Sequence, residues 1–137
     1  MKTTFDTDAI LFSLMQNSPV KKAINGGIYV GDDRPNDSDK EDIVVNSIAL
    51  TQDYLPQIGT SNVNLFVPDK NVKIGGKQQL QANRTRLKEL SEKAMETLRG
   101  ANITGLKLIL ASQTILEEPS VKQHFVNIRI DWNIQTF

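Results

Sequence analysis

The sequence predicts a single α+β domain over residues 1–137, with the order α-β-β-β-α-β-β, a mainly antiparallel sheet and helices packed on one face. The length of 137 residues suits one hydrophobic core. Two segments repeat apolar side chains every three to four residues, as amphipathic helices do. Other segments alternate apolar and polar side chains, as half-buried strands do. Helices and strands patterned in this way favour a sheet with helices on one side.

The first expected helix is capped by Asp6 or Thr7, since both side chains can accept a hydrogen bond from the first helical turn. Its apolar positions are Ile10, Leu11, Leu14 and Met15. Ser18 and Pro19 then read as a cap and a first helical position, and they predict another short helical turn. Gly26 and its neighbours end that turn.

Three strands are expected next. Residues 28–30 form a short apolar strand, and residues 43–50 have the mixed pattern of a largely buried strand. Residues 51–60, with a proline and a glycine, are predicted to form a loop. Residues 62–67 alternate and are stopped by Pro68. We expect these three strands to form a meander.

A polar segment, residues 70–76, leads into the strongest helical pattern, residues 77–99, which Gly100 ends. Its apolar positions are Leu80, Leu87, Leu90, Ala94 and Leu98. Two strands follow, residues 106–116 and 121–135. The apolar side chains of the last strand point one way, and Trp132 is among them: Val126, Ile128, Ile130, Trp132 and Ile134. We expect that face to be core and the other face to be wet or in contact with a partner.

Composition argues against several partners. The chain has 16 basic and 16 acidic residues, a net charge of +0 and a pI of about 6.6. Binding to nucleic acid or anionic membranes usually needs a positive excess, so we expect neither. There is no cysteine, which suits a reducing compartment, and the start of the chain has no secretory signal pattern. The cytoplasm is the expected location.

No catalytic, cofactor or metal site is predicted. His124 is the only histidine, and its sequence neighbours supply no carboxylate or second ligand. The stretch 73–78 contains glycines and lysines but lacks the spacing of a phosphate-binding loop. No serine lies in a nucleophile elbow.

One acidic segment is the only place where hard cations could find oxygen ligands: Asp32, Asp33, Asp37, Asp39, Glu41 and Asp42. Its spacing does not fit a calcium loop. A loop that starts at Asp37 would put Asp42 where the turn-forming glycine belongs and Ile48 where the bidentate glutamate belongs. We therefore expect a solvated loop or a protein interface.

Six stretches follow one another in an order that resembles the tail-completion (head–tail joining, minor tail) proteins of long-tailed phages and prophages. They are Gly-Gly-Ile-Tyr at 26–29, Arg-Pro at 34–35, the strand 42–46, the strand 62–67, the helix from Lys77, and the end of the closing hairpin at 125–132. The resemblance covers nearly the whole chain. The acidic segment and the long segment 70–79 depart from the family's commonest form.

The resemblance implies a non-enzymatic structural subunit of a homo-oligomeric ring between the head connector and the tail tube. It also implies connector and tail proteins as partners, with assembly in the cytoplasm and a final place at the head–tail junction of the virion. The expected assembly contacts are exposed loop charges: Asp33, Arg34, Asp37, Asp39, Lys70 and Lys73. Two alternatives stay open, a small cytosolic protein-binding or adaptor module of unrelated origin and an enzyme with a carboxylate site in the acidic segment.

Overall fold

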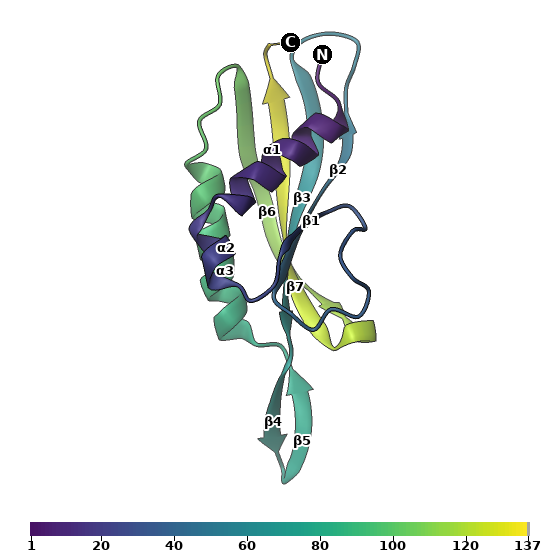
Figure 1. Cartoon of the computed structure of the whole chain (residues 1–137), viewed down its shortest axis with the longest axis vertical. Coiled ribbons are helices and arrows are strands. Elements are labelled where there is room, and N and C mark those ends of the chain that lie inside the picture. Colours follow the sequence, from purple (N-terminus) through teal and green to yellow (C-terminus); the bar gives the residue numbers. More distant parts are fainter. Residues whose placement is uncertain (137) are drawn as a thin grey trace.

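A computed structural model describes residues 1–136 and confirms the α+β class. Helices cover one face of a five-stranded sheet, and a separate two-stranded ribbon extends beyond it (Figure 1). The elements are α1 (Thr4–Gln16), α2 (Pro19–Ala23), β1 (Ile28–Val30), β2 (Asp42–Leu50), β3 (Gln57–Pro68), β4 (Lys70–Ile74), β5 (Lys77–Gln81), α3 (Arg84–Arg99), β6 (Leu106–Glu118), the 3₁₀ turn η1 (Pro119–Val121) and β7 (Gln123–Ile134).

The large sheet has the strand order β1-β2-β3-β7-β6. Every neighbouring pair is antiparallel except β1 and β2, which run parallel. The prediction that the first three strands form a meander is therefore wrong for β1, which runs parallel to β2. Residues 31–41 carry the chain back to the end of the sheet at which β1 began, as a parallel pair requires. That return path depends on tertiary contacts of the segment 31–42, which the local pattern of apolar and polar residues does not reveal.

Helix α1 begins earlier than predicted, because Thr3 and not Asp6 or Thr7 occupies the cap position. The Asp6 carboxylate accepts a hydrogen bond from the backbone N–H of Thr3 at 2.7 Å. This is the reciprocal half of a capping box, and the bond lowers the pKa of Asp6. Thr7 lies one turn further in and is buried.

The segment 70–81 is a β-hairpin, here called the arm, and not a loop followed by helix. Gly75 and Gly76 form its two-residue turn, with φ angles of 58° and 82°, which favour glycine. The predicted helix start at Lys77 is therefore wrong. Helix α3 begins at Arg84, where the Asn83 side chain accepts a bond from the Arg86 backbone N–H at 3.3 Å.

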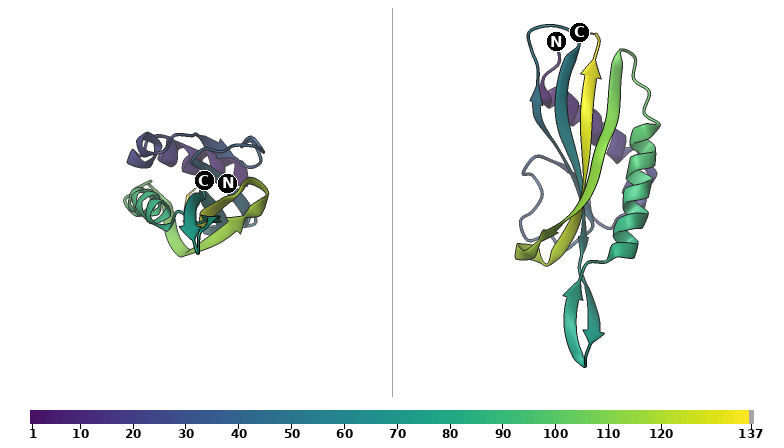
Figure 2. Two further views of the ribbon diagram at one scale, coloured as in Figure 1. Left: turned by 90° about the horizontal axis from the view of Figure 1, so that it is seen from below. Right: turned by 180° about the vertical axis from the view of Figure 1, so that it is seen from behind.

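Strand β3 also begins earlier than expected, at Gln57 within the predicted loop. The Gln57 side chain is fully buried. Its amide nitrogen donates to the carbonyl oxygens of Lys2 and Thr51 at 2.9 and 2.7 Å. Since Gln57 pairs with Ile134 across the sheet, the first residues of the chain lie beside the end of β7. Figure 2 shows both ends of the chain at the end of the molecule opposite the arm.

The core lies between the helices and the inner face of the sheet, and the predicted inner face of β7 is confirmed. Trp132 is 2% exposed, and its indole N–H donates to the Ser61 hydroxyl at 2.7 Å. Hydroxyl contacts continue from Ser61 to Ser47 at 2.7 Å and from Ser47 to Thr7 at 2.6 Å. This partly buried chain of hydrogen bonds joins α1 to β2, β3 and β7. It satisfies polar groups that would otherwise destabilise the core.

Candidate functional site

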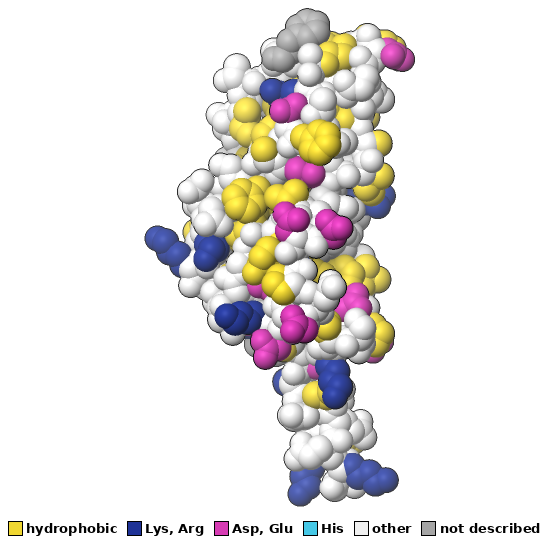
Figure 3. Space-filling view, turned by 45° about the vertical axis from the view of Figure 1, so that its right-hand side comes forward, with side chains coloured by type: hydrophobic (Ala, Val, Ile, Leu, Met, Phe, Trp, Pro, Cys, Tyr) yellow, Lys and Arg dark blue, Asp and Glu magenta, His cyan; other side chains and the backbone are white. Residues whose placement is uncertain are grey.

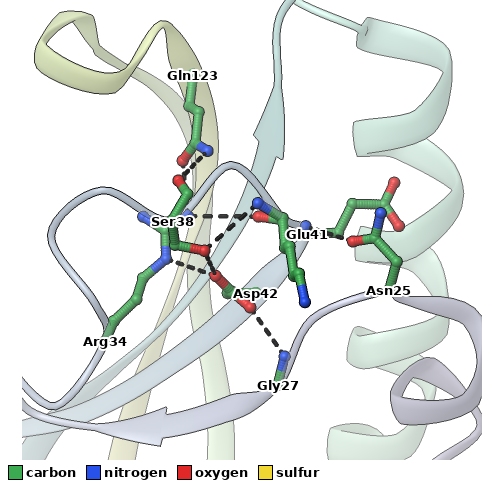
Figure 4. A network of polar contacts seen from close by, with 8 residues as sticks. Asn25, Gly27, Arg34, Ser38, Glu41, Asp42 and Gln123 are labelled. Atoms are coloured by element: carbon green, nitrogen blue, oxygen red, sulfur yellow. Dashed lines mark hydrogen bonds and ion pairs between the residues drawn. The ribbon is translucent and has the colours of Figure 1, made fainter.

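The acidic loop, residues 31–42, is anchored by its last residue. Asp42 begins β2 and is fully buried. Its carboxylate accepts bonds from the Gly27 backbone N–H at 2.8 Å and the Arg34 Nε at 2.9 Å, and from the Ser38 hydroxyl (Figure 4). Three donors satisfy a buried carboxylate that would otherwise be very costly. Two of them come from the loop itself, so the loop is folded back against the body.

Arg34 extends this network to the closing hairpin. Its Nη2 donates to the Gln123 side-chain oxygen at 2.7 Å, and the Gln123 amide donates in turn to the Ser38 carbonyl at 2.8 Å (Figure 4). The guanidinium also lies 4.1 Å from the centroid of the Phe66 ring, a cation–π contact. The Arg34 side chain is only 11% exposed. Arg34 was expected among the assembly contacts, but in the structure its side chain binds groups of the same chain.

A second ion pair joins the loop to α3. The Glu41 carboxylate accepts from the Arg86 Nε at 2.6 Å and Nη2 at 3.0 Å, the bidentate geometry that suits guanidinium. This hydrogen-bonded pairing raises the pKa of Arg86. The same guanidinium donates to the Ala23 carbonyl at 2.6 Å. Glu41 therefore ties the loop to α3 and to the end of α2.

The remaining acids of the loop face water. Asp33, Asp37 and Asp39 are all exposed, as an interface contact requires. Beside them a hollow of about 460 Å³ separates the loop from the turn η1, over the outer face of the sheet. Its lining mixes carboxylates, amides and apolar groups, notably Asp32, Asn46, Asn64, Phe66 and Glu118. Within residues 1–136 no three acidic or histidine side chains gather closely enough to hold a metal ion.

The arm is the second charged surface. It carries Lys70, Lys73 and Lys77, all exposed, and no acidic residue. Figure 3 shows it as a narrow extension with basic side chains at its far end. Ile74 and Leu80 are also exposed, at 44% and 42%. Lys70 and Lys73 were predicted as contacts within a loop, and the structure places them on a paired ribbon.

A histidine–aspartate pair holds the base of the arm. The His124 Nδ1 lies 2.6 Å from the Asp69 carboxylate, and Asp69 directly precedes β4. The Asp69 backbone N–H also donates to the Lys122 carbonyl at 3.0 Å. The sequence neighbours of His124 gave no sign of this partner, because Asp69 is 55 residues away. The register that pairs Val67 with His124 brings the two together.

A third feature, missed by sequence reasoning, is a groove of about 470 Å³ between α1 and β1, here called the α1–β1 groove. Its apolar walls include Phe5, Phe12 and Tyr29, and two carboxylates, Asp8 and Asp33, also line it. Phe5 is 82% exposed. The Asp8 Oδ1 is buried, and it has no hydrogen-bond partner among residues 1–136. The sequence signal for this groove was Phe5, an aromatic residue on the polar side of the α1 pattern.

None of the described helices is long and apolar enough to cross a membrane. No protein-family model matches the chain, and no curated protein matches it. The resemblance to tail-completion proteins therefore stays a prediction.

Proposed function

We propose that this chain is a non-enzymatic structural subunit of a phage or prophage head–tail connector or tail-completion assembly. The observation that carries the proposal is the arm, a paired ribbon that extends beyond the body and exposes both lysines and apolar side chains. A segment with that exposure is suited to contact another subunit. The order of elements along the chain resembles that of tail-completion proteins, and this resemblance indicates which kind of assembly the subunit would join.

The acidic loop supports the same role. Its exposed acids are held on a loop that two ion pairs fix to the body, a largely buried one at Asp42 and a half-buried one at Glu41. A charged surface on a fixed support can set the register and orientation of a neighbouring subunit. In this proposal the chain forms a homo-oligomeric ring with connector and tail proteins as partners. It assembles in the cytoplasm and ends at the head–tail junction of the virion.

The test is complementation in the source phage. Without the gene, filled heads and separate tails should accumulate, and wild-type protein should restore joined particles in electron micrographs. Normal infectious particles from the deletion would remove the tail-completion function.

The acidic loop is tested with the double variant Asp37→Lys/Asp39→Lys, which should fold but fail to restore joining. The matched control is Glu92→Lys/Glu96→Lys, which makes the same charge change on exposed positions of α3. Equal complementation by both variants would remove the loop from the interface while leaving the proposed function in place.

A small cytosolic protein-binding module is the second candidate, and the hollow beside the acidic loop favours it, since mixed polar and apolar hollows suit ligands and peptides. The gene neighbourhood separates the two. Genes for portal, capsid and tail-tube proteins on either side support the assembly subunit, and their absence supports the module.

A further inference from the structure

Within residues 1–136 the arm packs chiefly on itself. Its two strands have five residues each and pair chiefly with one another. An isolated two-stranded hairpin is marginally stable in water, so such a ribbon gains most from docking on another surface. Five residues of antiparallel strand extend it by roughly 17 Å. That reach places its tip well outside the body (Figure 1).

One face of the arm combines an apolar tip with positive charge. Ile74 pairs directly with Lys77, and Val72 pairs with Gln79, so these four side chains share a face. Lys70 lies on the same face at the base of the arm. A surface that receives this face needs an apolar hollow bordered by carboxylates.

The α1–β1 groove has that combination. Phe5, Phe12 and Tyr29 supply apolar walls large enough for an isoleucine side chain. Asp33 is exposed at the groove, and the Asp8 Oδ1 is a buried acceptor without a donor among residues 1–136. An unsatisfied buried acceptor destabilises a protein, and an incoming ammonium group would satisfy it. Figure 3 shows hydrophobic and acidic side chains next to one another on the body.

We propose that the arm of one copy docks in the α1–β1 groove of a second copy of this chain. Ile74 fills the aromatic hollow, and Lys77 lies against the carboxylates of Asp8 and Asp33. The arm of the same chain points away from the body, so the occupant comes from another molecule. This inference rests on the proposed function, because it names the surfaces through which the subunits of the ring would meet.

The two surfaces differ, so the contact runs from the arm of one subunit to the groove of the next. Such a heterologous contact closes into a ring when the rotation between subunits divides a full turn, and otherwise it continues as a filament. Because the contact pairs opposite charges, the affinity of the arm for the groove should fall as the salt concentration rises. Exposed charges are screened beyond about 8 Å in physiological salt.

The chain has no cysteine, so one cysteine per variant gives a clean cross-linking test. Gln79→Cys places a thiol on the docking face of the arm and keeps Ile74 and Lys77. Ala9→Cys places a thiol at the exposed rim of the groove. The two variants are mixed with different affinity tags under mild oxidation. A disulfide-linked heterodimer should form many-fold faster than with the control Lys88→Cys, whose thiol lies on the exposed side of α3.

Charge reversal provides the second measurement. Lys77→Glu in the Gln79→Cys chain should slow cross-linking to Ala9→Cys, and Asp33→Lys in the Ala9→Cys chain should restore part of the rate. Molar salt should slow cross-linking between the Gln79→Cys and Ala9→Cys chains that carry no charge reversal. Circular dichroism melting curves check that the body of every variant stays folded.

Equal cross-linking rates to Ala9→Cys and Lys88→Cys would overturn the docking. If the gene is nevertheless required for head–tail joining, the proposed function stands and only the arm contact fails. If the arm docks as expected but the gene deletion yields normal particles, the contact stands and the proposed function fails.

Discussion

The acidic loop and the arm look alike in the sequence and differ in the folded chain. Both are polar, charged and about twelve residues long. The loop uses Arg34, Glu41 and Asp42 in internal ion pairs, so only part of its charge faces outward. The arm pairs its backbone with itself and leaves its three lysines exposed. In this chain the loop is held by ion pairs at Asp42, the first residue of β2, and at Arg86 of α3, whereas the lysines of the arm form no ion pair among residues 1–136.

The largest expected loss of stability comes from truncating the tryptophan in the core. Trp132→Ala should lower the free energy of unfolding by about 3–5 kcal/mol, since it removes a large buried side chain and leaves a cavity. Urea denaturation measures the loss. Tryptophan fluorescence of the wild type should be blue-shifted, and an emission maximum typical of exposed indole in the folded protein would contradict the burial.

The anchoring of the loop is tested by Asp42→Ala. Removing one partner of a buried ion pair leaves the other charge uncompensated, so stability should fall by about 3–5 kcal/mol. Asp39→Ala, an exposed acid of the same loop, is the matched control and should change stability by less than about 0.5 kcal/mol. Similar effects from both variants would mean that the loop is held by its backbone and not by Asp42.

The independence of the arm is tested at its tip. Gly75→Ala/Gly76→Ala puts side chains at two left-handed positions, which costs about 1–2 kcal/mol at each. Because the arm pairs mainly with itself, this strain should open the arm and leave global unfolding nearly unchanged. Amide hydrogen exchange should quicken within residues 70–81 alone. Loss of protection in α3 or β7 as well would show that the arm and the body unfold together.

The smallest stability effect comes from the exposed acids. Asp37→Lys/Asp39→Lys should shift the free energy of unfolding by less than about 0.5 kcal/mol at each position, since neither residue belongs to the anchoring network. Thermal melting checks this. A large loss of stability would place these acids within the anchor of the loop and weaken the contrast with the arm.

The sequence predicted the parts of the fold that rest on side-chain periodicity. The alternation that places Trp132 in the core is confirmed, and so is the amphipathic pattern of α3 after Arg84. The arm was missed because Lys77–Gln81 is composed of good helix formers and Leu80 fits the helical phase. The turn at Gly75 and Gly76 favours a hairpin instead, and the Asn83 cap starts the helix later.

The candidate site was only partly predictable. Exposure of Asp33, Asp37 and Asp39 was expected from their place in a polar loop, and the structure has them exposed. The pairing of Arg34 with Asp42 depends on a loop path that no local pattern encodes. The α1–β1 groove forms because a helix and a strand that are separate in the sequence meet. Contacts of this kind arise from tertiary packing, which periodicity does not report.

The bond from Gln57 to the backbone of Lys2, opposite Ile134, holds the first residues of the chain beside the end of β7. A short linker could join them, and new ends could then be opened between Gly75 and Gly76. Such a circular permutant would turn the arm into two free tails while every strand of the large sheet kept its neighbours. If this permutant folds, the fold does not require a continuous arm, and a loss of joining would follow from the opened arm or from the new linker.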